Sequence, residues 1–128
     1  MIVRQIKMSS QAKERLSRLK GKTGIGNWNT LCRWALCYSL AEDTVPTDLP
    51  INTDSNLEMS WMTFAGEYYE LYEAIVKVWC RKKGLATDQK TAAKYFRLHL
   101  DRGIAYLSGT GFIRNIDDLL ALAEEKRK

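Results

Sequence analysis

The sequence is poor in the residues that build most catalytic and metal sites, because its 128 residues include one histidine and three cysteines. His99 lies at the border of an apolar helical face, where we expect a satisfied, partly buried histidine rather than a catalytic one. Cys32 and Cys37 are five residues apart, which on a helix separates them by about 140°, so they cannot jointly hold an ion. We expect buried, inert packing for these thiols and for Cys80. The sequence thus predicts no catalytic residue, no metal ion and no cofactor.

Other absences bear on where the protein works. An odd number of cysteines argues against a disulfide framework and favours a reducing cytoplasm. No apolar run approaches the roughly eighteen residues that a membrane span needs, and the first residues carry no apolar signal core. Prolines are confined to Pro46 and Pro50. We expect a cytoplasmic protein with no membrane association and one proline-containing loop.

Charge is abundant and is segregated along the chain. Residues 1–41 hold eight Lys/Arg and one acid, Glu14, whereas residues 42–73 hold eight acids and no base. Residues 74–128 return to twelve bases against six acids. Such segregation places a positive field on one part of the surface and suits a polyanion, of which nucleic acid is the commonest. The alternative is that these charges balance each other within or between subunits.

The pattern of apolar residues predicts a mainly helical single domain, 1–128, with a short N-terminal strand over 2–8. We divide it into a basic strand-helix-helix half (1–41), an acidic loop (42–62) and a helical half (63–128). A first helix begins after Ser9 or Ser10 and stops at Gly21. The next, capped by Asn27, is apolar almost all round, which indicates burial against a second subunit as well as its own core.

Three further helices are expected in the second half of the chain. The first runs from a Thr63 cap to about residue 83 and the second from residue 87 or 88 to 107, with Gly103 on its inner face marking close helix approach. The third is capped by Asn115 and ends near the basic residues 126–128. The inward face of the first of these helices is predicted to comprise Phe64, Tyr68, Leu71, Tyr72, Ile75, Val78 and Trp79.

The first helix carries most of the candidate nucleic-acid contacts. Lys13, Ser17 and Lys20 form one stripe at helical spacing, Lys22 extends it into the turn, and Arg18 lies on the other flank. The full set of candidate residues is Lys7, Lys13, Ser17, Arg18, Lys20, Lys22 and Arg33. Because lysines that contact phosphate do not read bases, we expect binding that is largely independent of sequence and weakened by salt.

Two residues outside the stripe have more than one interpretation. Arg33, in the only polar sector of the central helix, either joins the nucleic-acid surface or pairs with an acid in an interface between subunits. Trp61, beside a short polar stretch, is the one tryptophan that we leave open as a base-stacking surface.

The tract over residues 24–37, Gly-Ile-Gly-Asn-Trp-Asn-Thr-Leu-Cys-Arg-Trp-Ala-Leu-Cys, closely resembles the signature of the DndE family, the small component of the bacterial DNA phosphorothioation system. The tracts over 64–68 and 102–107 resemble its later signature segments. The resemblance implies a cytoplasmic protein working with a cysteine desulfurase, an adenylyl-sulfate-reductase-like enzyme and an ATPase, which replace a non-bridging backbone oxygen of DNA by sulfur. It further implies a non-catalytic homotetramer that binds duplex DNA, with a preference for nicked duplex.

Our leading hypothesis is therefore an accessory DNA-binding subunit of that system. The order strand, helix, turn, helix also fits a ribbon-helix-helix repressor, in which Gln5 and Lys7 on strands paired between two copies would read bases in the major groove. A third hypothesis is an assembly adaptor that docks other subunits without binding DNA. A nicking enzyme is the least favoured, since the chain lacks a convergent catalytic set.

Overall fold

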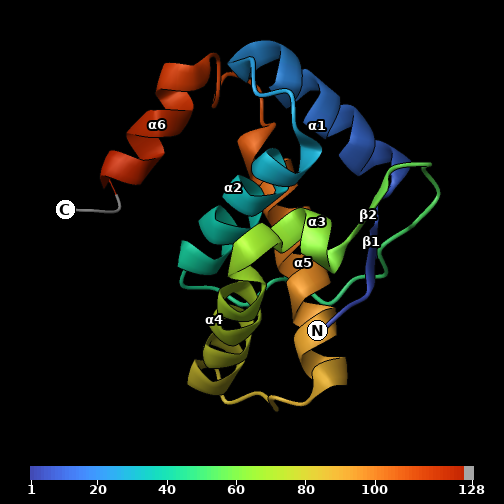
Figure 1. Ribbon diagram of the computed structural model, residues 1–128. Coiled ribbons are helices and arrows are strands. Elements are labelled where there is room, and N and C mark those ends of the chain that lie inside the picture. Colours follow the sequence, from blue (N-terminus) through green and yellow to red (C-terminus); the bar gives the residue numbers. More distant parts are fainter. Residues whose placement is uncertain (126–128) are drawn as a thin grey trace.

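The computed structural model describes residues 1–125, and the basic residues 126–128 lie outside that part. Helices surround a long central helix, and a small two-stranded sheet lies at one edge (Figure 1). The predicted mainly helical domain with a short N-terminal strand is confirmed. The elements in chain order are β1 (Gln5–Lys7), α1 (Ser10–Thr23), α2 (Trp28–Ala41), β2 (Glu58–Ser60), α3 (Trp61–Ala65), the 3₁₀ turn η1 (Gly66–Tyr68), α4 (Tyr69–Lys82), α5 (Gln89–Leu107) and α6 (Ile116–Glu125).

The core is built on the pair α2 and α5. The inner face of α5 is buried and includes Phe96, Leu100 and Ile104, and Asp88 caps the start of the helix by accepting a hydrogen bond from the Thr91 amide at 3.2 Å. A methyl group built at Gly103 would lie 1.9 Å from the carbonyl oxygen of Ala35 on α2. The predicted close approach at Gly103 is confirmed, because only a residue without Cβ fits there.

The N-terminal strand is shorter than the predicted 2–8, and it pairs within its own chain. β1 and β2 are antiparallel, with Gln5 opposite Ser60 and Lys7 opposite Glu58. Ile6 and Met8 are buried. A ribbon-helix-helix dimer pairs this strand with that of a second copy, whereas here the strand-helix-helix order is retained but β1 takes its partner from residues about fifty positions later.

Glycines set helix ends at positions that the sequence pattern did not single out. α1 continues past Gly21 and ends at Gly24, whose φ of 76° is the left-handed conformation that closes a helix. The predicted long helix from Thr63 is wrong, because Ser60 caps α3 instead and Gly66, with φ of 61°, separates α3 from α4. Asn27 occupies the predicted capping position of α2, but its side chain makes no capping hydrogen bond.

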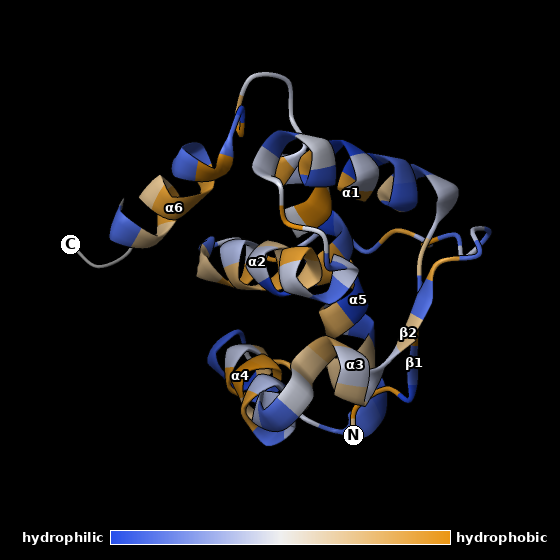
Figure 2. Ribbon diagram, turned by 45° about the horizontal axis from the view of Figure 1, so that its top comes forward, coloured by the Kyte–Doolittle hydropathy of each residue, from blue (hydrophilic) through white to orange (hydrophobic). Residues whose placement is uncertain are grey.

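The predicted orientation of α4 is partly wrong. Val76, Trp79 and Cys80 are its buried residues, while Leu71 and Val78 are 54% and 38% exposed. Apolar residues therefore occur on two sides of α4, as its colouring in Figure 2 also shows. Within residues 1–125, no helix is both long and apolar enough to cross a membrane.

Candidate nucleic-acid interface

The candidate interface is the outer side of α1, whose position follows from how the helix is anchored. The Ser9 hydroxyl accepts a hydrogen bond from the Ala12 amide at 3.0 Å, which fixes the start of the helix. A buried stripe that includes Leu16 and Leu19 packs α1 on the core. The candidate residues Ser17, Arg18 and Lys22 are exposed, and Lys13 and Lys20 are half-buried. Five of the seven candidate residues thus lie on one helix, but the prediction that Lys22 extends the stripe into a turn is wrong, because α1 continues to Thr23 and places Lys22 about 180° around the helix from Lys13.

The cations of α1 make no ion pair in the described structure. The ion pairs among residues 1–125 join other bases, namely the amino terminus, Lys77, Lys83, Lys94 and Arg114, to acids outside α1. An unpaired surface cation keeps its full electrostatic attraction for an anion in solution. The outer side of α1 is therefore a positive surface that its own chain leaves available.

Two lysines of this surface are nevertheless held in place by uncharged groups. The Lys13 ammonium donates a hydrogen bond to the side-chain carbonyl of Asn56, and the Lys20 ammonium lies 3.9 Å from the centre of the Trp28 ring. A cation over an aromatic face is stabilised without being neutralised. These contacts order the two side chains while preserving their charges.

The other two candidate residues lie elsewhere. Lys7 is on β1 opposite Glu58, where it lines a small cavity of about 50 Å³ together with Arg97 of α5. Arg33 donates a hydrogen bond to the Thr30 hydroxyl at 3.3 Å and lines an open depression of about 320 Å³ between α2 and α4. Neither residue lies on α1, although Ala12 of that helix also lines the cavity beside Lys7.

The acidic segment before β2 is fastened to bases and amides of its own chain. Asp43 binds Lys83, which follows α4, at 2.7 Å, and Asp48 binds Lys94 of α5. Asp54 accepts a hydrogen bond from the Ser10 amide at 2.8 Å, which lowers the pKa of its carboxyl group. Asp43 and Asp48 are thus paired with bases outside α1, whereas Asp54 binds the backbone at the first residue of that helix.

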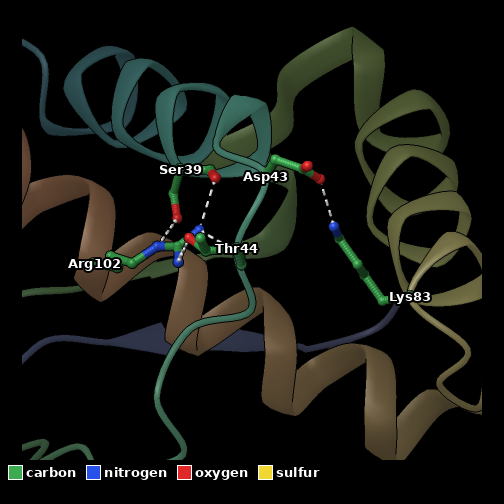
Figure 3. Close-up of polar contacts among 5 residues, drawn as sticks. All are labelled: Ser39, Asp43, Thr44, Lys83 and Arg102. Carbon is green, nitrogen blue, oxygen red and sulfur yellow. Dashed lines mark hydrogen bonds and ion pairs between the residues drawn. The ribbon is translucent and has the colours of Figure 1, made fainter.

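Arg102 forms the most extensive polar cluster, which the sequence analysis did not anticipate (Figure 3). Its guanidinium donates to the hydroxyl and the carbonyl oxygen of Ser39, at 2.8 and 2.9 Å, and to the hydroxyl and carbonyl oxygen of Thr44, at 2.9 and 3.1 Å. It therefore ties the start of the acidic segment to the end of α2. The one feature of the sequence that could have indicated this cluster is Ser39, a polar residue in an otherwise apolar part of α2.

His99 completes this cluster on its buried side. The Ser39 hydroxyl, which accepts a hydrogen bond from Arg102, also shares a hydrogen bond with Nδ1 of His99, 2.8 Å away. Burial, and secondarily Arg102, lowers the pKa of His99 to about 4. Ser39 and His99 are both fully buried, so they do not present a serine nucleophile to solvent. His99 is more deeply buried than predicted, and its Nε2 has no partner among the described residues.

The three cysteines differ in how far they are buried. Cys32 and Cys80 are buried as predicted, and burial raises the pKa of Cys32 to about 12. The prediction is wrong for Cys37, which is exposed.

Trp61 is fully buried and donates a hydrogen bond to the Tyr69 carbonyl oxygen at 3.3 Å, so it is a core residue and not a stacking surface. In the described part of the chain, no three His, Cys, Asp or Glu residues gather as metal ligands would.

Comparison with known proteins assigns the family. The model of the family described as DNA sulphur modification protein DndE matches residues 5–115. The crystal structure of DndE from Escherichia coli B7A, involved in DNA phosphorothioation modification, is 28% identical, with a TM-score of 0.68 over 84% of this chain and 98% of that one. A DndE variant with two glycine-to-lysine substitutions, involved in DNA phosphorothioation, is 23% identical, with a TM-score of 0.62 over 84% and 100% of the two chains, and supports the fold alone.

No curated protein matches this chain. The family match nevertheless spans every element from β1 to the turn before α6, and it includes the tract of residues 24–37 that carries the sequence resemblance. The chain therefore belongs to the DndE family and is a component of the DNA phosphorothioation, or sulfur-modification, system.

Proposed function

We propose that this protein is a non-catalytic, cytoplasmic DNA-binding subunit of the phosphorothioation system, and that α1 contacts the sugar-phosphate backbone of duplex DNA. The observation that supports the proposal is the outer side of α1, where Arg18 and Lys22 are exposed, Lys13 and Lys20 are half-buried, and no carboxylate pairs with them in the described structure. Family membership supplies the DNA-modifying context.

Backbone binding by lysines explains what such a subunit contributes. Phosphate contacts hold a protein on DNA without selecting a sequence, so other components of the machinery would carry out the chemistry and select its position. We also infer that several copies assemble, as a tetramer according to the family resemblance. Symmetry then repeats a modest basic surface, and linked weak contacts give tight binding overall.

The decisive experiment is a charge reversal on α1. In a gel-shift assay, the triple variant Lys13→Glu, Lys20→Glu, Lys22→Glu should give no shifted band at concentrations at which the wild-type protein shifts all the duplex. Each lost phosphate contact should also reduce the slope of log K against log salt by about 0.9, or roughly 2.7 per subunit for three contacts. Titration at several salt concentrations measures that slope.

A matched control reverses three exposed bases at the opposite end of the molecule that make no ion pair in the described structure. Arg81 and Lys82 lie at the end of α4, and Lys90 lies on the first turn of α5, away from α1 (Figure 1). The triple variant at these positions changes the net charge equally, and we expect it to bind DNA nearly as well as wild type. Undiminished binding by the α1 variant, or equal losses in both variants, would refute a localised interface on α1.

A preference for nicked over intact duplex DNA needs a separate experiment. We propose that nicked duplex binds better than intact duplex of the same sequence, because a nick relieves stiffness and lets the backbone follow the protein surface. Competition of the two unlabelled duplexes against one labelled probe measures the ratio. Equal competition would remove the preference for nicks but leave backbone binding in place.

A further inference from the structure

Residues 54–56 of the acidic segment before β2 lie against the first turn of α1. The Asp54 carboxylate accepts a hydrogen bond from the Ser10 amide at 2.8 Å, and the side-chain carbonyl of Asn56 accepts one from the Lys13 ammonium. Both Asp54 and Asn56 are exposed to solvent. Two side chains with oxygen acceptors therefore occupy the end of the basic surface at which α1 begins.

The backbone between these two side chains is held independently of them. The Ser55 hydroxyl donates a hydrogen bond to the Met8 carbonyl oxygen at 2.7 Å, and the Ser55 amide donates to the same oxygen at 3.2 Å. The Met8 amide donates in turn to the Leu57 carbonyl oxygen at 3.1 Å. Asp54 and Asn56 can therefore leave α1 by rotating their side chains, while the chain between them stays bound.

A phosphate group of DNA would compete with both side chains. Its oxygens accept hydrogen bonds from a lysine ammonium as the Asn56 carbonyl oxygen does, but they carry a negative charge that an amide oxygen lacks. Ser10 and Lys13 are about 4.5 Å apart along the helix axis, so Asp54 places its own negative charge near any phosphate bound by Lys13. Asn56 occupies the ammonium, and Asp54 repels its ligand.

We propose that Asp54 and Asn56 form an autoinhibitory contact on α1, which weakens DNA binding by the free protein and opens when Lys13 takes a phosphate. The proposal rests on the proposed function, since it needs Lys13 in the DNA interface, and it adds the residues that limit affinity there. Asn56 acts through Lys13 and does not itself touch DNA. Attraction between the ammonium and the charged phosphate drives the opening.

Substitution of Asn56 tests the competition for Lys13. Asn56→Ala leaves the net charge unchanged and frees the ammonium, so it should lower the dissociation constant for a labelled duplex about threefold in fluorescence anisotropy. Asn56→Asp would instead pair with Lys13 and should raise that constant about tenfold. Asn52, which is exposed and makes no side-chain hydrogen bond within residues 1–125, is the matched control. Asn52→Ala should bind as wild type and Asn52→Asp within about twofold of it.

Substitution of Asp54 tests the repulsion. Asp54→Asn keeps an oxygen that can accept from the Ser10 amide but removes the charge, so we expect unchanged circular dichroism and binding about threefold tighter. Asp48→Asn makes the same change of net charge in the same segment, where the carboxylate pairs with Lys94 of α5 instead. We expect this control to tighten binding by no more than about 1.5-fold.

Nuclear magnetic resonance of the isotope-labelled protein shows whether DNA opens the contact. On addition of duplex, the side-chain amide signals of Asn56 should move toward the positions that they take in Lys13→Gln without DNA, because both changes remove the ammonium from the Asn56 carbonyl. The signals of Asn52 serve as the internal control and should stay in place.

Three results would overturn the proposal: Asn56→Ala binding no tighter than wild type, equal losses in Asn56→Asp and Asn52→Asp, or Asn56 signals that DNA does not move. These failures differ from failure of the proposed function. If the triple variant of Lys13, Lys20 and Lys22 loses DNA binding but Asn56→Ala does not tighten it, only the autoinhibitory contact is refuted. If the triple variant still binds DNA, the proposed function is refuted as well.

Discussion

Replacing Gly103 by alanine tests the closest helix contact in the protein. The added methyl carbon would lie 1.9 Å from the carbonyl oxygen of Ala35 and 2.5 Å from its carbonyl carbon. Both atoms belong to the backbone of α2, so no rotation of a side chain can relieve the overlap. The helices must move apart by about 1 Å or more, which loosens the core around them.

The size of the effect follows from two opposing contributions. Alanine favours a helix over glycine by about 1 kcal/mol, whereas forcing an extra carbon into a packed interface costs about 3 kcal/mol or more. We expect a net loss of about 2–3 kcal/mol in the free energy of unfolding, or about 8–10 °C in melting temperature for a domain of this size. Urea unfolding followed by circular dichroism measures the loss.

Gly21 provides a control for the same substitution. It lies inside α1, and a methyl group built on it would meet no atom within 4 Å. Gly21→Ala should therefore stabilise the protein by about 0.5–1 kcal/mol through helix propensity alone. If Gly103→Ala were as stable as Gly21→Ala, the close approach of α2 and α5 would not be a feature of the folded protein.

Three other predictions concern the buried polar cluster and the thiols. The pKa of His99 in the folded protein is about 4, below its ordinary value of 6.5. The free energy of unfolding should therefore be highest above pH 6.5 and fall by about 3 kcal/mol as the pH drops to 4. His99→Gln should remove this part of the pH dependence of unfolding. Iodoacetamide should label Cys37 in the folded protein but label Cys32 only after unfolding, which mass spectrometry distinguishes. Arg102→Ala should destabilise the protein by about 2 kcal/mol and speed proteolysis within residues 42–57, because it removes the hydrogen bonds that tie this segment to α2.

Each of these predictions has an outcome that would contradict it. An unchanged pH profile in His99→Gln would show that another group takes up the proton on unfolding. Equal labelling of Cys32 and Cys37 in the folded protein would contradict the burial of Cys32. Arg102→Lys serves as the comparison for proteolysis of Arg102→Ala. If Arg102→Ala is cleaved at the wild-type rate, other contacts are sufficient to hold the segment over residues 42–57.

The sequence predicted the parts of the fold that depend on local chemistry. A helix start was expected at Ser9 or Ser10, near residue 87 or 88, and at Asn115, and Ser9, Asp88 and Asn115 each accept a hydrogen bond from an amide in the first turn. The inner face of α5 was predicted because a helix packed on one side repeats its apolar residues every three to four positions. Gly103 was informative because glycine inside such a face has a cost that close packing offsets.

The errors arise where local patterns have two solutions. Gly21 and Gly24 are both able to end α1, and only the backbone conformation distinguishes them. Similarly, the apolar residues Leu71 and Val78 fit the face of a helix, but periodicity does not tell whether that face packs on its own core. The break at Gly66 depends on contacts between distant segments, which a single sequence does not display.

The candidate interface was only partly predictable for a related reason. The stripe of Lys13, Ser17 and Lys20 follows from helical spacing and the buried Leu16. The surroundings of these lysines, Asn56 and Trp28, come from other parts of the chain and became visible only in the folded arrangement. Arg102 was missed because its partners on α2 and beyond are about sixty residues away in sequence.

The pairing of Asp43 and Asp48 with Lys83 and Lys94 has a consequence for how fast the protein finds a polyanion. Because these acids are paired with bases outside α1, they do not neutralise the unpaired cations of that helix. Unpaired surface cations speed the diffusional encounter with an oppositely charged partner, and dissolved salt screens that attraction. The rate of association with a polyanion would therefore fall as the salt concentration rises.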